Sequence, residues 1–199
     1  MILLMAALLK IITFGDSTTA PRKNVTVYTD LLAMQLAEKA ILLNKGVPGN
    51  TTAMAKKRFE RDVLAENPDI VVVQFGLNDS AVDVWKNPPA DSPRVSPKEY
   101  EENLRYFINE IRKKGAQPVL MTPNQMRWSN SLRKLYNKPS YDLSDERGSM
   151  PLLTTYVEIV RKRAKELDVP LVDIFSLYDE WEKQTGEPVE ALLSVLFHY

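Results

Sequence analysis

Short apolar runs alternate along the chain with longer segments in which apolar residues recur every three or four positions. This alternation is typical of parallel strands connected by helices that cross over a sheet. The expected strands are the runs 10–14, 41–43, 70–75, 119–121 and 171–175. The β-branched residues at 70–73 indicate the buried centre of the sheet. The pattern therefore predicts an α/β fold with a five-stranded parallel sheet.

The segments between the strands have the spacing of amphipathic helices. They are residues 28–40, 51–65, 97–114 and 152–167. The third has the most complete end signals, because Ser96 offers an N-cap, Pro97 fits the first turn and Glu99 stands three positions after the cap. Gly115 follows its basic end as a stop signal. Such helices are expected to cover both faces of the sheet in one three-layer domain.

Two long stretches rich in Pro, Asn, Ser and Asp, residues 80–95 and 124–148, each follow an expected strand. Loops at the carboxyl ends of parallel strands are where α/β proteins bind ligands, so both are candidate walls of a substrate site. Trp85, Arg127 and Trp128 lie on these loops and are candidates for stacking on a sugar or contacting an acidic group. The alternative is that they pack the loops against the domain.

Composition narrows the range of partners. The 199 residues suit a single domain, and 26 basic residues balance 26 acidic ones, which favours a small neutral substrate over nucleic acid or an anionic membrane. The basic triplets at 56–58 and 161–163 are interpreted as solvated helix faces. Without cysteine and with one histidine, no disulfide, metal or cofactor is expected.

Residues 2–9 are wholly apolar but too short to span a bilayer, and no basic segment precedes them. We expect an extension of the first strand or residues ahead of the true start, and a clipped signal sequence is the alternative. The absence of cysteine does not decide between a cytoplasmic and an exported protein, and the oligomeric state is not indicated.

Three motifs carry the candidate chemistry. Gly15-Asp16-Ser17 follows the first strand and presents a serine, although such a turn commonly uses all three residues for backbone reasons. Gly49 follows the second strand and would leave a backbone N–H open at the start of a helix. Asn78 follows the third strand and has an amide that can donate to an oxyanion. Each also suits an ordinary turn, but together they fit one site at the carboxyl edge of the sheet.

With these motifs the chain resembles the SGNH (GDSL-type) hydrolases, which are serine esterases and lipases with a flavodoxin-like three-layer fold. The resemblance runs from about Lys10 to the C-terminus. It implies that Ser17 is the nucleophile and that the N–H groups of Ser17 and Gly49 and the side chain of Asn78 form the oxyanion hole. It is closest to bacterial acetylesterases and lysophospholipase-like esterases, and the absence of a long apolar lid favours a short acyl ester such as an acetyl group on a carbohydrate.

The chain departs from this family at its C-terminal end. The family takes its catalytic base from a D-x-x-H segment, and the matching residues here are Val195-Leu196-Phe197-His198, with valine in place of the acid. Three interpretations stay open: His198 acts as a lone base, the coding sequence is truncated or frame-shifted after about Leu193, or the protein is a pseudoenzyme. Because loss of the orienting acid can cost about 10⁴ in kcat, we expect weak activity at most.

The remaining acidic residues offer no clear replacement. Asp173, near the end of the fifth expected strand, is a conceivable substitute acid, and capping of the strand end is the alternative. Asp16 and Asp79 flank the site, but hydrogen bonds to loop N–H groups account for both, so neither is assigned a chemical role. A phosphate binder that uses residues 15–19 as an anion loop is a further alternative, against which the joint presence of Gly49 and Asn78 argues.

Overall fold

A five-stranded parallel sheet forms the centre of the protein. The computed structural model describes residues 8–23, 25–145 and 151–192. The strands are β1 (Leu9–Gly15), β2 (Ala40–Gly46), β3 (Ile70–Gln74), β4 (Gln117–Met121) and β5 (Leu171–Val172). They lie in the order β2-β1-β3-β4-β5, and every neighbouring pair is parallel. The predicted fold class is therefore confirmed.

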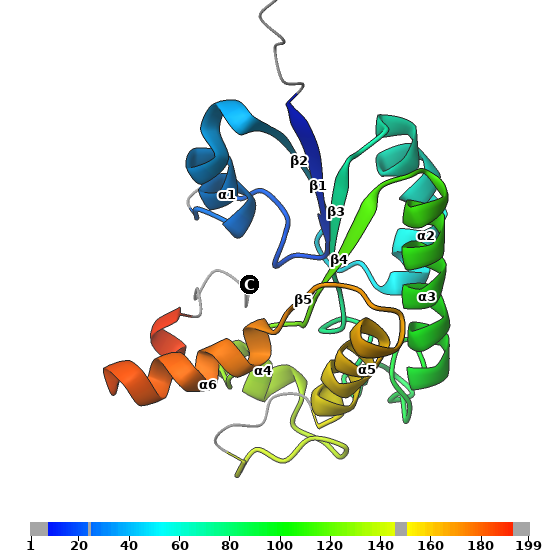
Figure 1. Cartoon of the computed structure of the whole chain (residues 1–199). Helices are drawn as coiled ribbons and strands as arrows, with labels where there is room; N and C mark the ends of the chain where they lie inside the picture. The colour runs from blue at the N-terminus through cyan, green and yellow to red at the C-terminus, as the bar shows by residue number, and fades with distance from the viewer. Residues whose placement is uncertain (1–7, 24, 146–150, 193–199) are drawn as a thin grey trace, which may run out of the picture.

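Helices flank both faces of the sheet. They are α1 (Tyr28–Leu36), α2 (Thr52–Asp62), α3 (Pro97–Lys113), α4 (Asn130–Leu135), α5 (Leu153–Glu166) and α6 (Ile174–Thr185). Short 3-10 turns occupy Ala37–Lys39, Leu64–Glu66 and Val189–Leu192. Figure 1 shows α2, α3 and α5 on one side of the sheet and α1 on the other. The result is the expected three-layer arrangement.

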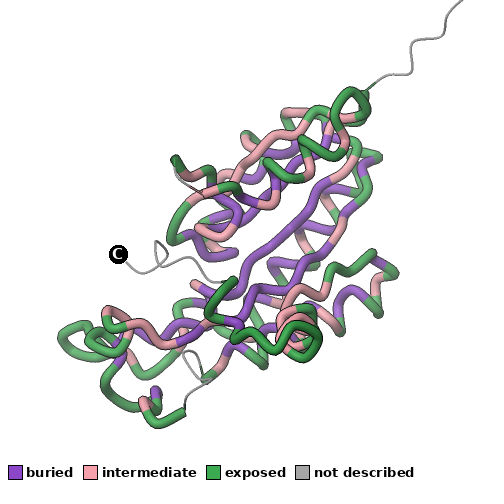
Figure 2. Tube along the Cα trace, turned by 90° about the vertical axis from the view of Figure 1, so that its left-hand side faces the viewer, coloured by how far each residue is buried: buried purple, intermediate pink, exposed green. Residues whose placement is uncertain are grey.

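The main core lies between the sheet and the layer of α2, α3 and α5. Phe14 of β1 is fully buried there, with its ring centre 5.4 Å from that of Phe59 and 5.6 Å from that of Phe107. Alternate residues of the central strands, such as Ile12 and Val73, point into the same cluster. Figure 2 shows the buried trace running along these strands. The apolar runs of the sequence therefore hold the carboxyl ends of β1 and β3 in fixed positions.

The strand order also locates the ligand-binding edge. From β1 the chain moves to β2 on one side, and from β3 it moves to β4 and β5 on the other. The order therefore reverses between β1 and β3. In open α/β sheets such a switch point leaves a crevice at the carboxyl ends of the strands, where ligands bind. The motifs of Ser17 and Asn78 directly follow these two strands.

The end of the sheet differs from the prediction. The fifth strand was expected over 171–175 but ends at Val172, and α6, which the sequence pattern did not predict, begins at Ile174. Asp173 separates the two and caps the helix, because its carboxylate accepts a hydrogen bond from the N–H of Ser176 at 3.3 Å. The apolar residues on either side of Asp173 thus belong to a short strand and to the first turn of an amphipathic helix. The stretch 124–148, expected as a loop, contains the short helix α4.

The basic triplets are not wholly solvated, which corrects the sequence interpretation. Arg163 of α5 is only 4% exposed and forms ion pairs with Glu101 of α3 and with Glu166. Arg58 of α2 is also largely buried, with 10% of its side chain exposed. Each is the third residue of its triplet and lies on the inner side of its helix. Three consecutive basic residues on a helix point to different sides of it, so at least one of them can pack against the protein while the others face solvent.

The N-terminal apolar segment is only partly described. Residues 1–7 lie outside the described residues, while Leu8 and Leu9 are exposed and Leu9 is the first residue of β1. Within the described ranges, no helix combines the length and the apolar character needed to cross a membrane.

Candidate active site

The turn that carries Ser17 is held by the buried side chain of Asp16. One carboxylate oxygen of Asp16 accepts hydrogen bonds from both the N–H and the hydroxyl of Thr18, each at 2.9 Å. Ser17 lies between these two residues and is half-buried. Gly15 is required here because a Cβ atom at this position would lie 2.1 Å from the hydroxyl oxygen of Thr19. The local sequence thus forms a tight turn at the end of β1.

The loop that contains Gly49 is joined to this turn. The N–H of Val47 donates to the carbonyl of Gly15 at 3.0 Å. Gly49 is exposed and has a φ angle of +75°, a conformation that favours glycine, with open space where a Cβ atom would stand. The loop ends at Thr51, whose hydroxyl accepts from the N–H of Met54 and caps α2.

Arg58 locks the first two loops together. Its guanidinium donates to the carbonyl of Gly15 at 3.1 Å, to the carbonyl of Lys45 at 2.9 Å and to the side-chain oxygen of Asn50 at 2.8 Å. It also lies 4.5 Å above the ring centre of Phe14. One side chain therefore fixes the ends of β1 and β2 relative to the start of α2.

Asn78 connects the third loop to the first. Its amide nitrogen donates to the second carboxylate oxygen of Asp16 at 3.2 Å, and its amide oxygen accepts from Arg94 at 3.0 Å. The next residue, Asp79, is buried and accepts from the backbone N–H of Thr52 at 2.8 Å. The loops after β1, β2 and β3 are therefore linked pairwise by hydrogen bonds. The structure brings the neighbourhoods of the three sequence motifs to one edge of the sheet.

Burial perturbs both acidic residues of this edge. Burial raises the pKa of Asp16 above its ordinary value, against hydrogen bonds from Thr18 and Asn78 that lower it. Burial also raises the pKa of Asp79 to about 7, despite its hydrogen bonds with Thr52. The second carboxylate oxygen of Asp79 is buried and has no hydrogen-bond partner among the described residues. A protonated carboxyl suits that position better than a charged one.

A cleft of about 180 Å³ opens beside the Ser17 turn. Thr18, Gln74 and Asn124 form its polar wall at the ends of β1, β3 and β4. The rest of the lining is mostly apolar and comes from residues 25–28, from α6 and from Leu192. Gln74 is buried, and its side-chain oxygen accepts from the hydroxyl of Thr18 at 3.1 Å, so the cleft and the turn share a hydrogen-bond network. The space is suited to a small group.

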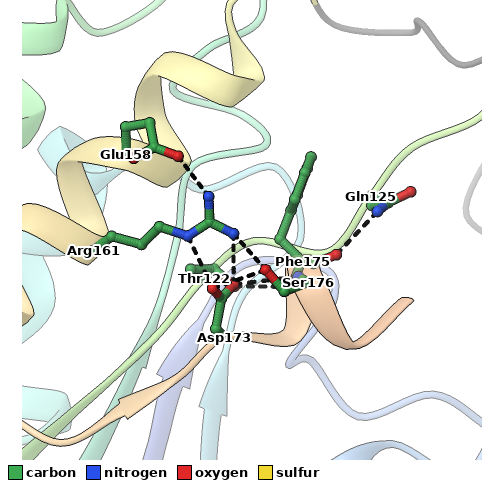
Figure 3. Close-up of polar contacts among 7 residues, drawn as sticks. All are labelled: Thr122, Gln125, Glu158, Arg161, Asp173, Phe175 and Ser176. Carbon is green, nitrogen blue, oxygen red and sulfur yellow. Dashed lines mark hydrogen bonds and ion pairs between the residues drawn. The ribbon is translucent and has the colours of Figure 1, made fainter. Parts of the chain in front are cut away.

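Asp173, the conceivable substitute acid, is engaged elsewhere (Figure 3). Its carboxylate accepts from Arg161 at 2.9 and 3.1 Å, from Thr122 at 3.2 Å, and from the hydroxyl of Ser176 at 3.0 Å. Burial acts to raise its pKa, but the hydrogen bonds from Arg161 and Ser176 outweigh burial, and the pKa is lowered. These contacts are those of a helix cap that also joins α5 to α6.

The loop residues expected to contact substrate have different environments. Arg127 is only 7% exposed, donates to the carbonyl of Met126 and pairs with Glu190 at 3.8 Å. Trp128 is half-buried and donates from its indole nitrogen to the carbonyl of Asp145 at 2.9 Å. Trp85 differs from both because it is 46% exposed. Packing within the loops accounts for Arg127 and Trp128.

His198 and the rest of the degenerate D-x-x-H segment lie outside the described residues. Within the ranges that are described, no three histidine, cysteine or acidic side chains gather closely enough to hold a metal ion.

Two residues of the site that the sequence analysis did not predict are Arg58 and Arg94. Arg58 was assigned to a solvated face, and Arg94 meets Asn78 only because the loop 80–95 folds back. Neither carries a recognisable local signal.

Comparison with known proteins shows similarity in sequence and in fold. Residues 13–199 match the GDSL-like Lipase/Acylhydrolase family. The chain is 35% identical over 175 residues to the uncharacterized lipoprotein YqeF of Bacillus subtilis, which covers 82% of this chain and 69% of that protein. It is 38% identical over 85 residues to the acetylxylan esterase of Geobacillus stearothermophilus, a match that covers 41% of this chain and 37% of that enzyme.

Solved structures extend the similarity to almost the whole chain. The crystal structure of Axe2, an acetylxylan esterase from Geobacillus stearothermophilus, superimposes with a TM-score of 0.72 and 25% identity over 96% of this chain and 89% of its own. Two further structures of Axe2 are described as catalytic mutants, one with a serine and one with a histidine replaced by alanine. They have TM-scores of 0.68 and 0.70, identities of 25% and 26%, and cover 88% and 96% of this chain and 80% and 89% of their own.

Proposed function

Because the chain belongs to the GDSL-like lipase/acylhydrolase (SGNH hydrolase) family, we propose that it hydrolyses a small carboxylic ester through an acyl-enzyme on Ser17. The observation that carries this proposal is the hydrogen bond from Asn78 to Asp16 at 3.2 Å, which ties the candidate oxyanion-hole amide to the residue before Ser17. This link stands at the switch point between β1 and β3, where α/β sheets bind ligands.

In the proposed reaction the hydroxyl oxygen of Ser17 attacks the ester carbonyl carbon and loses its proton to a base. The carbonyl π electrons move to the oxygen, which accepts hydrogen bonds from the N–H groups of Ser17 and Gly49 and from the Asn78 amide. The tetrahedral intermediate then expels the alcohol, which takes up the proton. Water attacks the acyl-enzyme in the same manner and releases the acid and free Ser17.

His198 is the proposed base, as a lone histidine without the family acid. The serine and histidine catalytic mutants of the acetylxylan esterase support these two roles by analogy. Val195 stands where the acid of the D-x-x-H segment belongs, so the imidazole lacks the partner that would fix its tautomer. We therefore expect turnover well below that of a complete triad, by as much as about 10⁴.

The proposed substrate is an acetyl or other short acyl ester, with a carbohydrate as the alcohol. The relatives named acetylxylan esterase and rhamnogalacturonan acetylesterase support this class, and a cleft of about 180 Å³ beside Thr18 suits a small group. The exposed ring of Trp85 is the proposed stacking surface for a sugar. Arg127, which is buried, and Trp128, which is half-buried, are less suited to that contact.

The proposal is tested with p-nitrophenyl acetate and with a fluorophosphonate probe, which modifies an activated serine. We expect slow hydrolysis by the native chain and covalent labelling that disappears in Ser17→Ala. Ser92→Ala removes an exposed serine of the loop 80–95 and serves as the matched control, which should label normally. Equal rates for the native chain and Ser17→Ala would remove the nucleophile assignment. His198→Gln should lower the labelling rate if His198 is the base.

The alternative is a binding protein that keeps the fold without turnover. The valine at position 195 is the observation that favours it. In that case the native chain would resist the fluorophosphonate as completely as Ser17→Ala does, while acetylated xylooligosaccharides would still raise its melting temperature.

A further inference from the structure

Arg94 is joined to the candidate oxyanion hole by a contact that the sequence motifs do not include. One guanidinium nitrogen donates to the amide oxygen of Asn78 at 3.0 Å. Two other nitrogens of the same group donate to one carboxylate oxygen of Asp83, at 2.8 and 3.0 Å. The second oxygen of Asp83 pairs with Lys86 at 2.7 Å. Arg94 is therefore held between a buried carboxylate and the amide of Asn78.

The loop itself fixes the position of Arg94. The backbone N–H of Arg94 donates to the carbonyl of Ala81 at 3.0 Å, and that of Val95 donates to the carbonyl of Asp79 at 3.2 Å. The end of the loop 80–95 thus returns to its own start, directly after Asn78. The side chain of Asp83 is 5% exposed, against 28% for that of Arg94. The ion pair with Asp83 and the backbone hydrogen bonds of the loop thus hold the partly exposed Arg94 side chain beside Asn78.

These contacts decide which way the Asn78 amide faces. Its oxygen meets a donor on Arg94, and its nitrogen meets an acceptor on Asp16 at 3.2 Å. A flipped amide would set donor against donor and acceptor against acceptor, so only one orientation satisfies both neighbours. Among the described residues, Asp16 is the only acceptor for this amide, which leaves the second N–H for a bound carbonyl oxygen.

The charge of Arg94 also acts on the strength of that N–H. A hydrogen bond accepted by an amide oxygen polarises the group and makes its N–H hydrogens better donors. The positive charge partly offsets the carboxyl of Asp16 on the other side of the amide, which would oppose a developing oxyanion if charged. The same Asp16 accepts from the N–H of Thr18, so the chain of contacts ends at the turn that holds Ser17.

We propose that Arg94 is a positioning residue of the oxyanion hole, which orients the Asn78 amide toward the ester carbonyl and strengthens its hydrogen bond to the transition state. This inference rests on the proposed esterase function of the same site. In this proposal the loop 80–95 contributes to the reaction because Arg94 orients Asn78, and the loop does not contact the ester itself. A purely structural salt bridge with Asp83 would not require the bond to Asn78.

The test compares Arg94→Met with Lys86→Met. Both remove one positive partner of Asp83, but only Arg94 contacts Asn78. For p-nitrophenyl acetate we expect Arg94→Met to lower kcat about 10- to 100-fold with KM changed less than about 3-fold, since one indirectly weakened donor costs less than a deleted one. Lys86→Met should stay within about 2-fold of the native rate, and Arg94→Lys should recover part of the loss.

A double-mutant cycle separates action through Asn78 from a general effect. In an Asn78→Ala background, Arg94→Met should change kcat by less than about 2-fold, because the group through which it acts is gone. An undiminished loss in that background would overturn the proposal, as would equal rates for Arg94→Met and Lys86→Met. Thermal unfolding of each variant shows whether the fold is retained.

A second measurement does not depend on activity. The side-chain amide resonances of Asn78, identified by their absence in Asn78→Ala, should shift in Arg94→Met and stay in place in Lys86→Met. If the native chain does not react with fluorophosphonate but these resonances respond as expected, the proposed esterase function fails while the orienting contact stands. If Ser17 reacts with the probe but the Asn78 resonances do not change in Arg94→Met, the inference about Arg94 fails while the proposed esterase function stands.

Discussion

Thr52 donates two hydrogen bonds to a single carboxylate oxygen of Asp79, from its backbone N–H at 2.8 Å and from its hydroxyl at 2.5 Å. The bonds join the first turn of α2 to the loop after β3, and the hydroxyl of Thr52 also accepts from Asn103 of α3 at 3.2 Å. Asp79 thus holds two layers of the protein together beneath the candidate site. Its other oxygen is buried without a partner among the described residues, which is a position for a proton.

The first prediction concerns the pH dependence of stability. Burial raises the pKa of Asp79 from an ordinary value near 3.8 to about 7, so the folded chain binds this proton more tightly than the unfolded chain does. Its contribution to stability is therefore complete below about pH 4 and is lost as the pH rises to about 7. Asp79→Asn keeps the acceptor for Thr52 and removes the titration.

We expect the melting temperature of Asp79→Asn to increase relative to that of the native chain as the pH rises from about 4 to about 8. Asp91→Asn, which changes an exposed aspartate of the neighbouring loop, is the control. A constant difference between Asp79→Asn and the native chain across this range would show that Asp79 does not carry the proton.

The second prediction concerns Arg58, which the sequence placed on a solvated helix face. Arg58→Met removes donors from the carbonyls of Gly15 and Lys45 and from Asn50, and it should lower stability by about 2–4 kcal/mol, or roughly 5–15 °C in melting temperature. Because these bonds fix the loops at the site, the rate of Ser17 labelling should fall as well. Arg61→Met removes a mostly exposed partner of the same Asp62 and should change neither by much. Equal effects of the two variants would contradict the assigned role.

The third prediction concerns Asp173. Loss of its charge weakens the ion pair with Arg161 and the cap of α6, so Asp173→Asn should cost about 1–2 kcal/mol of stability. Ester hydrolysis, measured well below the melting temperature, should stay within about 3-fold of the native rate. A loss near the factor of about 10⁴ expected for a triad acid would instead make Asp173 the missing acid.

The contrast between Asp173 and Phe14 shows how far a sequence pattern can lead. Phe14 belongs to a short apolar run between turn signals, and burial of such runs between helix layers is the general solution for an α/β chain. The fold and the three motif-bearing turns were therefore predictable. The run at 171–175 is also largely apolar, but the aspartate within it can cap a helix, and only the surrounding residues Arg161 and Thr122 decide between a strand and a helix cap.

In the candidate site, too, some residues could be recognised from the local sequence and others could not. Ser17, Gly49 and Asn78 were recognisable as candidates because each follows a strand, and parallel strands bring their carboxyl ends to one edge. Arg58 and Arg94 were not, since their partners lie on other elements and depend on the path of a loop. The spacing of residues along the chain does not reveal which groups a long, charged side chain contacts. Long-range hydrogen bonding of this kind requires coordinates.

The last prediction uses two glycines in the same backbone conformation. Gly49 and Gly115 have φ angles of +75° and +78°, and a Cβ atom would meet nothing within 4 Å at either. Alanine at each position is therefore strained by backbone conformation alone, and both variants should lose about 1 kcal/mol of stability. Gly115 lies between α3 and β4, at the opposite edge of the sheet from Gly49.

The two variants should differ in their chemistry. If the N–H of Gly49 donates to the oxyanion, the backbone shift in Gly49→Ala should lower the rate of Ser17 labelling and of p-nitrophenyl acetate hydrolysis by about 10- to 100-fold. Gly115→Ala should retain the native rates at an equal loss of stability. Identical rates for both variants would exclude Gly49 from the oxyanion hole and leave Asn78 and the N–H of Ser17 as its donors. Because both variants are expected to lose the same stability, a difference between their rates reports on the site and not on the stability of the fold.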